Sequence, residues 1–205
     1  MLFCQGDVWD HVLFIRTGWV QIYRQFPNGQ RLILRFVLPG EPVGLESDGG
    51  AMPYTAETMT AVTGCLIGRA GFFLACARSP ALARGVAALA MRETLVAWDH
   101  LCSVGRQDAR GRIAALLLDL HRRLTPPTER EEVAEREGAP VRVPLTQTHI
   151  ADATGLTSVH VSRTLKRMRQ ERLLDFHKGE LVILDSARLG ALAQPDAPSV
   201  TLTPR

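Results

Sequence analysis

Short apolar runs of strand length alternate with turn signals in the N-terminal part of the chain. The runs at residues 12–15, 19–23 and 32–37 are rich in β-prone side chains, and Thr17-Gly18 and Pro27-Asn28-Gly29 separate them. Asn28-Gly29 tolerates positive φ and favours a tight hairpin between the second and third runs. This spacing, continued to about Ser79, predicts a jelly-roll or barrel-like arrangement of strands.

The pattern changes after Pro80, where apolar positions recur alternately four and three residues apart. Such a heptad seam predicts a long helix, and a narrow apolar stripe on a single helix is best buried against a second copy. We therefore expect a parallel homodimer. The polar members of the seam, Glu93 and His100, either meet solvent at its edge or set its register. The seam comprises Leu82, Val86, Leu89, Glu93, Val96 and His100.

A second helix is expected from residue 109 to residue 124, where Pro126-Pro127 would stop it. Its inward positions are Ile113, Leu116, Leu117 and Leu120. The following residues, 128–138, are mostly Glu and Arg and have almost nothing to bury, which predicts an exposed loop or a frayed helix.

Two short helices with a sharp bend are predicted next. Thr146 can cap a helix over residues 147–153, Gly155 supplies the turn, and Thr157 caps a second helix that extends to Glu171. The second helix has an apolar inner face of Val161, Leu165 and Met168. Apolar runs at 173–176 and 181–184 then flank Lys178-Gly179, which predicts a β-hairpin. The order is that of a helix-turn-helix followed by a wing.

The outer face of this segment predicts nucleic-acid binding. Residues 163–172 contain five basic residues and a single acidic one, Glu171. A basic helix can be merely a solvated surface, but the caps, the turn glycine and the hairpin together favour a DNA-binding role. In this motif the first residues of the second helix meet base edges, whereas nearby basic and hydroxyl groups contact phosphates. The expected DNA-binding residues are Thr146, Gln147, Thr148, Thr157, Ser158, Val159, His160, Ser162, Arg163, Lys166, Arg167 and Lys178.

Composition narrows the remaining classes. The 205 residues are 46% hydrophobic and 22% charged, as in an ordinary globular chain, and the net charge of +3 is too small to prove a nucleic-acid partner. No apolar run approaches the roughly 20 residues of a membrane span, and the start lacks the features of a signal peptide, so we expect a cytoplasmic protein. The cysteine spacing favours reduced thiols and no zinc site.

Two other functions compete with DNA-dependent regulation. Metal-dependent cupin enzymes share the jelly-roll architecture, but they need clustered histidines with a carboxylate, and the first hundred residues contain only His11 and His100. We therefore expect no enzyme and no metal site. An architectural DNA-binding dimer without an effector stays open.

The order of strand-rich domain, heptad helix and winged helix resembles the CRP/FNR family of transcription regulators. Matching strings are Leu2 to Asp7, Leu13 to Gly18, Pro39-Gly40-Glu41 with Val43-Gly44, and Gly155-Leu156-Thr157 with Val161-Ser162-Arg163. The resemblance covers about Leu2 to Ala193 and implies an α+β fold with a β-roll effector domain over residues 1–79, a dimerisation helix over 80–105 and a winged helix-turn-helix over 106–193. Residues 194–205 fall outside it and are expected to form a flexible tail. It also implies double-stranded DNA and RNA polymerase as partners.

One departure from the family concerns the effector. Members that bind cyclic AMP carry a Gly-Glu pair and an Arg-Ser or Arg-Thr pair. The corresponding positions here, a candidate effector pocket, are Gly44, Glu46, Tyr54 and Thr55, so Tyr54 replaces the phosphate-binding arginine. Cyclic-nucleotide control is therefore not expected. A small-molecule, haem-type or redox effector is left open.

Two further departures concern the cofactor and the operator. Cys65 resembles the internal ligand of the oxygen-sensing branch, but the chain begins at Met1-Leu2-Phe3, inside the opening turn, and Cys4 alone cannot complete an iron-sulfur cluster. Either the start is truncated or this branch senses something else; no cofactor is expected from these residues, and an iron-sulfur cluster or haem stays open. Val159 stands where well-known members have Glu, and it can pack on a thymine methyl but cannot accept a hydrogen bond. Arg163 keeps the guanine-reading position of the family.

Overall fold

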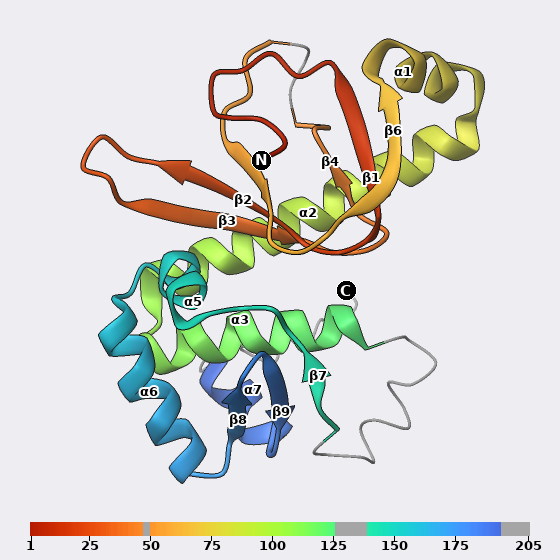
Figure 1. Ribbon diagram of the computed structural model, residues 1–205. Coiled ribbons are helices and arrows are strands. Elements are labelled where there is room, and N and C mark those ends of the chain that lie inside the picture. Colours follow the sequence, from red (N-terminus) through yellow and green to blue (C-terminus); the bar gives the residue numbers. More distant parts are fainter. Residues whose placement is uncertain (47–49, 126–138, 194–205) are drawn as a thin grey trace, which may run out of the picture. The chain divides into compact units, whose positions relative to one another are not determined.

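The computed structural model describes residues 1–46, 50–125 and 139–193 (Figure 1). Strands predominate in the first part of the chain and helices in the second, which is the α+β arrangement predicted. The elements are β1 (His11–Thr17), β2 (Val20–Gln25), β3 (Arg31–Val37), β4 (Pro42–Val43), β5 (Thr55–Thr58), β6 (Thr63–Gly68), α1 (Arg69–Arg78), α2 (Pro80–Arg106), α3 (Ala109–Leu124), β7 (Val141–Arg142), α5 (Gln147–Thr154), α6 (Ser158–Gln170), β8 (Leu174–His177), β9 (Glu180–Ile183) and α7 (Ser186–Ala193).

The chain forms two compact units, Met1–Asp99 and His100–Arg205. The boundary between them falls inside α2, so this one helix contributes to both units. The expectations for residues 128–138 and for the tail at 194–205, and the helix stop at Pro126-Pro127, lie outside the described residues. Within the described part, no single helix is long and apolar enough to cross a membrane; α1 and α2 meet that criterion only as a pair bent by 117°.

The first unit contains two antiparallel three-stranded sheets, ordered β4-β1-β6 and β3-β2-β5. The three predicted strand runs are confirmed as β1, β2 and β3. Gly29 has φ +79° in the turn between β2 and β3, so the hairpin at Asn28-Gly29 is confirmed as well. Side chains from both sheets form the core, among them Ile15, Ile22 and Val43.

The sequence pattern predicts strands up to about Ser79. This prediction is wrong for residues 69–78, which form the helix α1. Phe72 of α1 is 4% exposed, and its ring centroid lies 5.8 Å from that of Phe14 on β1. The apolar residues 72–74 therefore belong to a helix that packs on the sheet through Phe72, and an apolar run this short does not distinguish a helix from a strand.

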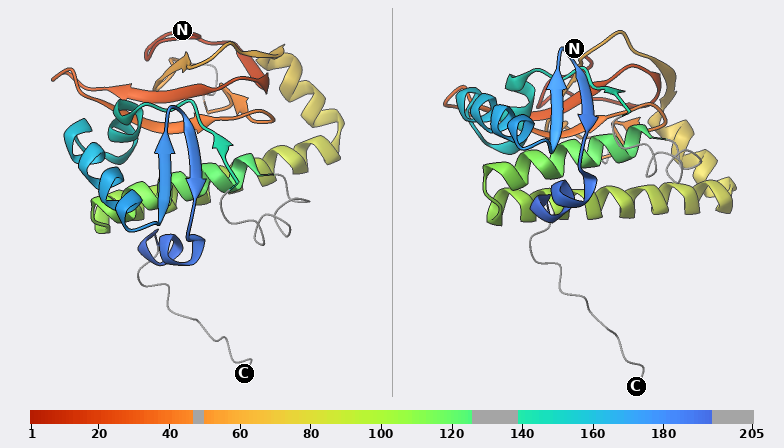
Figure 2. Two further views of the ribbon diagram at one scale, coloured as in Figure 1. Left: turned by 60° about the horizontal axis from the view of Figure 1, so that its bottom comes forward. Right: turned by 90° about the horizontal axis from the view of Figure 1, so that it is seen from below.

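The second unit is built on α3, which has the predicted bounds. Ile113, Leu117 and Leu120 are fully buried, whereas Leu116 is only half-buried. The helices α5 and α6 and the terminal helix α7 contact α3. The hairpin of β8 and β9 is visible in both views of Figure 2, and β7 extends it to a three-stranded sheet.

Candidate nucleic-acid interface

The first short helix, α5, begins at a capping box and ends at a left-handed glycine. The Thr146 hydroxyl accepts a hydrogen bond from the His149 N–H at 3.2 Å, and His149 Nδ1 accepts one from the Thr146 N–H at 3.2 Å. Gly155 has φ 66° and donates its N–H to the Ala151 carbonyl. This closure turns the chain sharply toward α6, as the sequence predicts.

The second helix, α6, presents an apolar face inward and a polar face outward. The Thr157 hydroxyl accepts a hydrogen bond from the His160 N–H at 3.2 Å and so caps the helix. Val161, Leu165 and Met168 are buried, as predicted. Every residue expected to bind DNA is exposed, and Val159 is 60% exposed although it is apolar. The surface is therefore available to a ligand along the whole outer face of the helix.

The wing places Lys178 at the tip of its hairpin. Lys178 has φ 50° and Gly179 has φ 78°, which is the backbone of a two-residue turn with positive φ at both positions. Val143 N–H donates to the Gly179 carbonyl at 2.8 Å and connects the chain after β7 to this turn. Lys178 is exposed.

A groove of about 620 Å³ lies beside α6, and it contains residues that the sequence pattern does not single out. Asp108 and Arg110, at the beginning of α3, line it together with Thr157, Arg163 and Arg167 of the α6 segment. The contribution of α3 cannot be read from the pattern, because a basic residue in the first turn of a helix resembles an ordinary solvated one.

Glu171 pairs with two of the arginines that line this groove. Its carboxylate accepts hydrogen bonds from Arg110 Nη2 and, at 2.9 Å, from Arg167 Nε. The hydrogen bond from Arg167, together with the charge of Arg110, lowers the pKa of Glu171 below its ordinary value. Glu171 is therefore the anionic centre of a three-residue cluster that joins α3 to the end of α6.

Arg112 fixes the helix-turn-helix to α3 from a different side. Its Nε donates to the Gln107 carbonyl at 3.0 Å, and its Nη1 donates to the Thr154 carbonyl at 3.3 Å. Thr154 is the last residue of α5, so this arginine satisfies a carbonyl at a helix end that has no partner within the helix.

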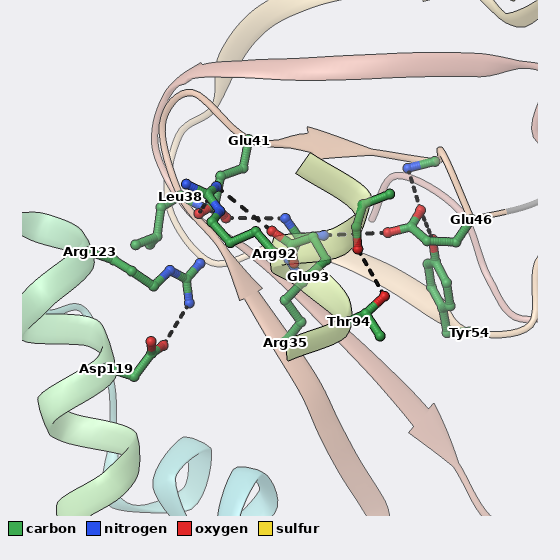
Figure 3. A network of polar contacts seen from close by, with 12 residues as sticks. Arg35, Leu38, Glu41, Glu46, Tyr54, Arg92, Glu93, Thr94, Asp119 and Arg123 are labelled. Atoms are coloured by element: carbon green, nitrogen blue, oxygen red, sulfur yellow. Dashed lines mark hydrogen bonds and ion pairs between the residues drawn. The ribbon is translucent and has the colours of Figure 1, made fainter. Parts of the chain in front are cut away.

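The candidate effector position is occupied by the protein's own side chains (Figure 3). The Tyr54 hydroxyl donates a hydrogen bond to Glu46 Oε2, and the Gly44 N–H donates to the same oxygen at 3.2 Å. Tyr54 is only 6% exposed, and its burial, with the Glu46 charge close by, raises its pKa far above the ordinary value. Thr55, also 6% exposed, accepts a hydrogen bond from the Gln5 N–H at 3.0 Å.

Arg35 connects this position to α2 (Figure 3). Its guanidinium lies 3.5 Å from Glu46, 3.3 Å from Glu41 and 2.9 Å from Glu93. Arg92 of α2 approaches Glu41 and Glu93 at 3.8 and 3.9 Å. Glu93 is thus an ion-pair partner of the mostly buried Arg35 within the first unit. The Glu93 side chain is 24% exposed.

This arrangement changes the interpretation of the heptad seam. Val86, Leu89, Glu93, Val96 and His100 are half-buried within the chain itself, and only Leu82 is exposed. The face of α2 that carries large exposed apolar side chains is another one. Its members are Met91 at 70%, Leu95 at 57%, Trp98 at 61% and Leu101 at 70% exposure. We call these four residues the α2 stripe.

The cysteines and acidic residues do not assemble into a metal centre in the part of the chain that the structure describes. Cys4, Cys65, Cys76 and Cys102 are all free thiols. Within the described residues, no group of three or more His, Cys, Asp or Glu side chains is placed to hold a metal ion. An iron-sulfur cluster needs four ligands, so these residues do not fit one.

A winged helix-turn-helix with an exposed basic helix, preceded by a β domain of two small sheets, defines a DNA-binding protein with an additional N-terminal domain. Comparison with known proteins agrees with this class. A family model for the cyclic nucleotide-binding domain matches residues 1–79, and a model for the Crp-like helix-turn-helix domain matches residues 111–192. The nitrogen fixation regulation protein FixK of Bradyrhizobium diazoefficiens is 32% identical over 194 residues, which are 94% of this chain and 78% of FixK.

Two further similarities concern a second regulator and a solved structure. The transcriptional activatory protein AadR of Rhodopseudomonas palustris is 30% identical over 94% of this chain and 77% of AadR. The structure of FixK2 from Bradyrhizobium japonicum superposes with a TM-score of 0.80 and is 28% identical, covering 93% of this chain and 90% of FixK2. The chain belongs to the CRP/FNR family of transcription regulators: it is a DNA-binding regulator and not an enzyme.

Proposed function

We propose that the protein binds an inverted-repeat operator as a homodimer and reads each half-site with the N-terminal part of α6. The observation that carries this proposal is the outer face of α6, on which Ser158, Val159, Ser162 and Arg163 are all exposed while the inner face is buried. Arg163 reads a guanine through its O6 and N7, and Val159 packs on a thymine methyl group. Lys166, Arg167 and Lys178 contact phosphates and set the register.

The dimer surface that we propose is the α2 stripe. Its residues are spaced four, three and three apart and lie on one side of the helix. Two copies related by a two-fold axis would bury these side chains against each other, and they would present two α6 helices to successive turns of the major groove, about 34 Å apart. RNA polymerase is the further partner that we propose for the bound dimer.

Selection of bound duplexes from a random pool tests the operator proposal directly. The expected result is an enriched inverted repeat with a guanine at a fixed position of each half-site. Sequences that show no inverted symmetry, or no enrichment at all, would contradict the proposal.

We propose further that cyclic AMP is not the effector, because Tyr54 and Glu46 bind each other where a cyclic phosphate would need an arginine. The buried Tyr54 hydroxyl is a donor that is already used, and the exposed Glu46 carboxylate beside it brings a negative charge that repels a phosphate. Titration calorimetry with cyclic AMP at millimolar concentration should show no binding, and operator affinity should not change. Micromolar binding would refute this part of the proposal.

A further inference from the structure

Glu171 stands out among the residues near the groove, because it is an acid in the DNA-facing half of the second unit and contacts two arginines that line the groove. One of them, Arg110, comes from α3 and the other, Arg167, from α6 itself. An acid close to a DNA-binding surface repels phosphate, so its presence needs a physical explanation.

The two arginines differ in how much freedom they have without Glu171. The Arg167 side chain is 68% exposed, so in solution it would be free to sample many rotamers. The Arg110 side chain is 24% exposed, and its Nε is buried without a hydrogen-bond partner among the described residues. The ion pair with Glu171 therefore orients the Arg110 guanidinium, and the same carboxylate fixes the direction of Arg167 on α6.

Fixed guanidinium groups favour one register on the duplex. Arg163 lines the same groove as Arg110 and Arg167, and Glu171 contacts the last two of these three arginines. Phosphates recur at regular intervals along the backbone, and rigid donors contact them well only where Arg163 also meets its guanine. Mobile arginines would instead follow the phosphates of any sequence, because such contacts carry no sequence information.

We infer that Glu171 is a specificity-determining residue: by holding Arg110 and Arg167 it restricts their phosphate contacts to the register that Arg163 reads. Arg110 thereby becomes an additional phosphate-binding residue that belongs to α3. This inference rests on the proposed function, since it presupposes that α6 reads an operator.

The test compares E171Q with D175N, a matched control. Asp175 pairs with Arg169 at 2.8 Å in the same unit, and neither residue lines the groove. Both variants remove one negative charge; D175N releases Arg169, and E171Q releases Arg110 and Arg167. Affinity is measured for the selected operator and for a random duplex, each at two salt concentrations.

For E171Q, random-duplex affinity should rise by roughly 3 to 10-fold while operator affinity changes little, so the specificity ratio falls by a similar factor. The salt slope on random duplex should steepen by about one unit for each additional phosphate that a released arginine neutralises. For D175N, both affinities should rise together and leave the ratio unchanged. An unchanged ratio in E171Q overturns the inference.

A second variant, R110Q, keeps the inference testable if E171Q folds poorly. The operator preference of the wild type distinguishes a failure of the proposed function from a failure of the role of Glu171. If E171Q lowers the thermal midpoint too far for binding assays, R110Q takes its place, and it should weaken the operator by roughly 3 to 10-fold with a smaller loss on random duplex. Equal losses of R110Q on both duplexes overturn the inference. A wild type that shows no operator preference refutes the proposed function itself, whereas a preference that E171Q leaves intact refutes only the role of Glu171.

Discussion

At the scale of single residues, we propose that the outer face of α6 divides base reading from phosphate contact. Arg163 and Lys166 are both exposed on α6, three residues apart. Arg163→Ala should weaken the preferred site by about 10 to 100-fold and leave random-duplex binding nearly intact, because a bidentate guanine contact is worth roughly 1 to 3 kcal/mol of discrimination. Competition binding at two salt concentrations measures both quantities.

Lys166→Ala is the control for this substitution. It should weaken specific and random duplexes alike and lower the salt slope by about one unit, since it removes a phosphate-binding group. Equal losses on both duplexes for Arg163→Ala would mean that Arg163 also binds only phosphate and that the assignment of base reading to this residue is wrong.

In the first unit, substitution of Tyr54 tests the hydrogen bond between its hydroxyl and Glu46. Tyr54→Phe keeps the buried ring beside Phe3 and removes the hydroxyl that donates to Glu46. The free energy of unfolding should fall by about 1.5 to 3 kcal/mol, as for a hydrogen bond to a charged partner. Urea denaturation followed by fluorescence measures the change. A loss below about 0.5 kcal/mol would show that Glu46 finds equivalent partners in Arg35 and the Gly44 N–H.

At the scale of elements, the turn between α5 and α6 depends on one backbone conformation. A Cβ at Gly155 would lie 3.9 Å from Arg112 Nη1, which is ordinary contact, so there is room for a side chain. The cost of Gly155→Ala is then the left-handed backbone alone, about 1 to 2 kcal/mol of unfolding free energy, which urea denaturation measures. Gly155→Asn should cost less, because Asn visits this region readily. If Asn and Ala cost the same, the strain has another source.

The helix-turn-helix can be predicted from sequence because its signals are local. Thr146, Gly155 and Thr157 act on residues within one helical turn, and the alternation of Val161, Leu165 and Met168 with exposed positions has one interpretation. The capping role of His149 does not follow from the pattern, since Glu or Gln is the usual residue at that position.

The face of α2 that we propose for the dimer cannot be predicted in the same way. Two stripes with near-heptad spacing run along α2, one through Leu89 and Val96 and the other through the α2 stripe. The spacing of apolar residues indicates which face of a helix is buried, but it does not identify the element or the second chain that packs against that face. The side-chain partner of Glu93, Arg35, lies far away in sequence, and only the fold brings the two together. The contact of Glu171 with Arg110 of α3 cannot be predicted from the sequence either, because the two residues are far apart in the chain and only the fold brings them together.

At the scale of the whole molecule, the α2 stripe makes a prediction about assembly. Leu95→Glu places a charge among Met91, Trp98 and Leu101 and should convert a dimer to a monomer in sedimentation velocity, with loss of cooperative operator binding. Leu95→Met keeps an apolar side chain of similar size at the same position and should remain dimeric. A Leu95→Glu protein that sediments as the wild type does would place the dimer surface elsewhere.

Stability should also depend on pH through the second unit. Burial lowers the pKa of His100 below its ordinary value of 6.5, partly opposed by the charge of Asp119, and burial lowers the pKa of His121 as well. The unfolded chain therefore takes up protons first, so stability is retained above about pH 6.5 and falls as the pH drops below it. His100→Gln should flatten this dependence in urea denaturation between about pH 7 and pH 5, with the exposed His177→Gln as control. An unaltered slope in His100→Gln would exclude His100 as its source.

The boundary between the two compact units falls within α2, and insertions into this helix test whether it holds the units at a fixed rotation. Each residue of a helix advances the chain by about 1.5 Å and turns it by about 100°. One alanine inserted near Asp99 would therefore rotate everything that follows by more than a quarter turn while adding almost no length. Seven inserted residues would restore the angle to within about 20° and add about 10 Å. Operator binding that fails with one inserted residue and recovers with seven would show that α2 transmits torsion between the units.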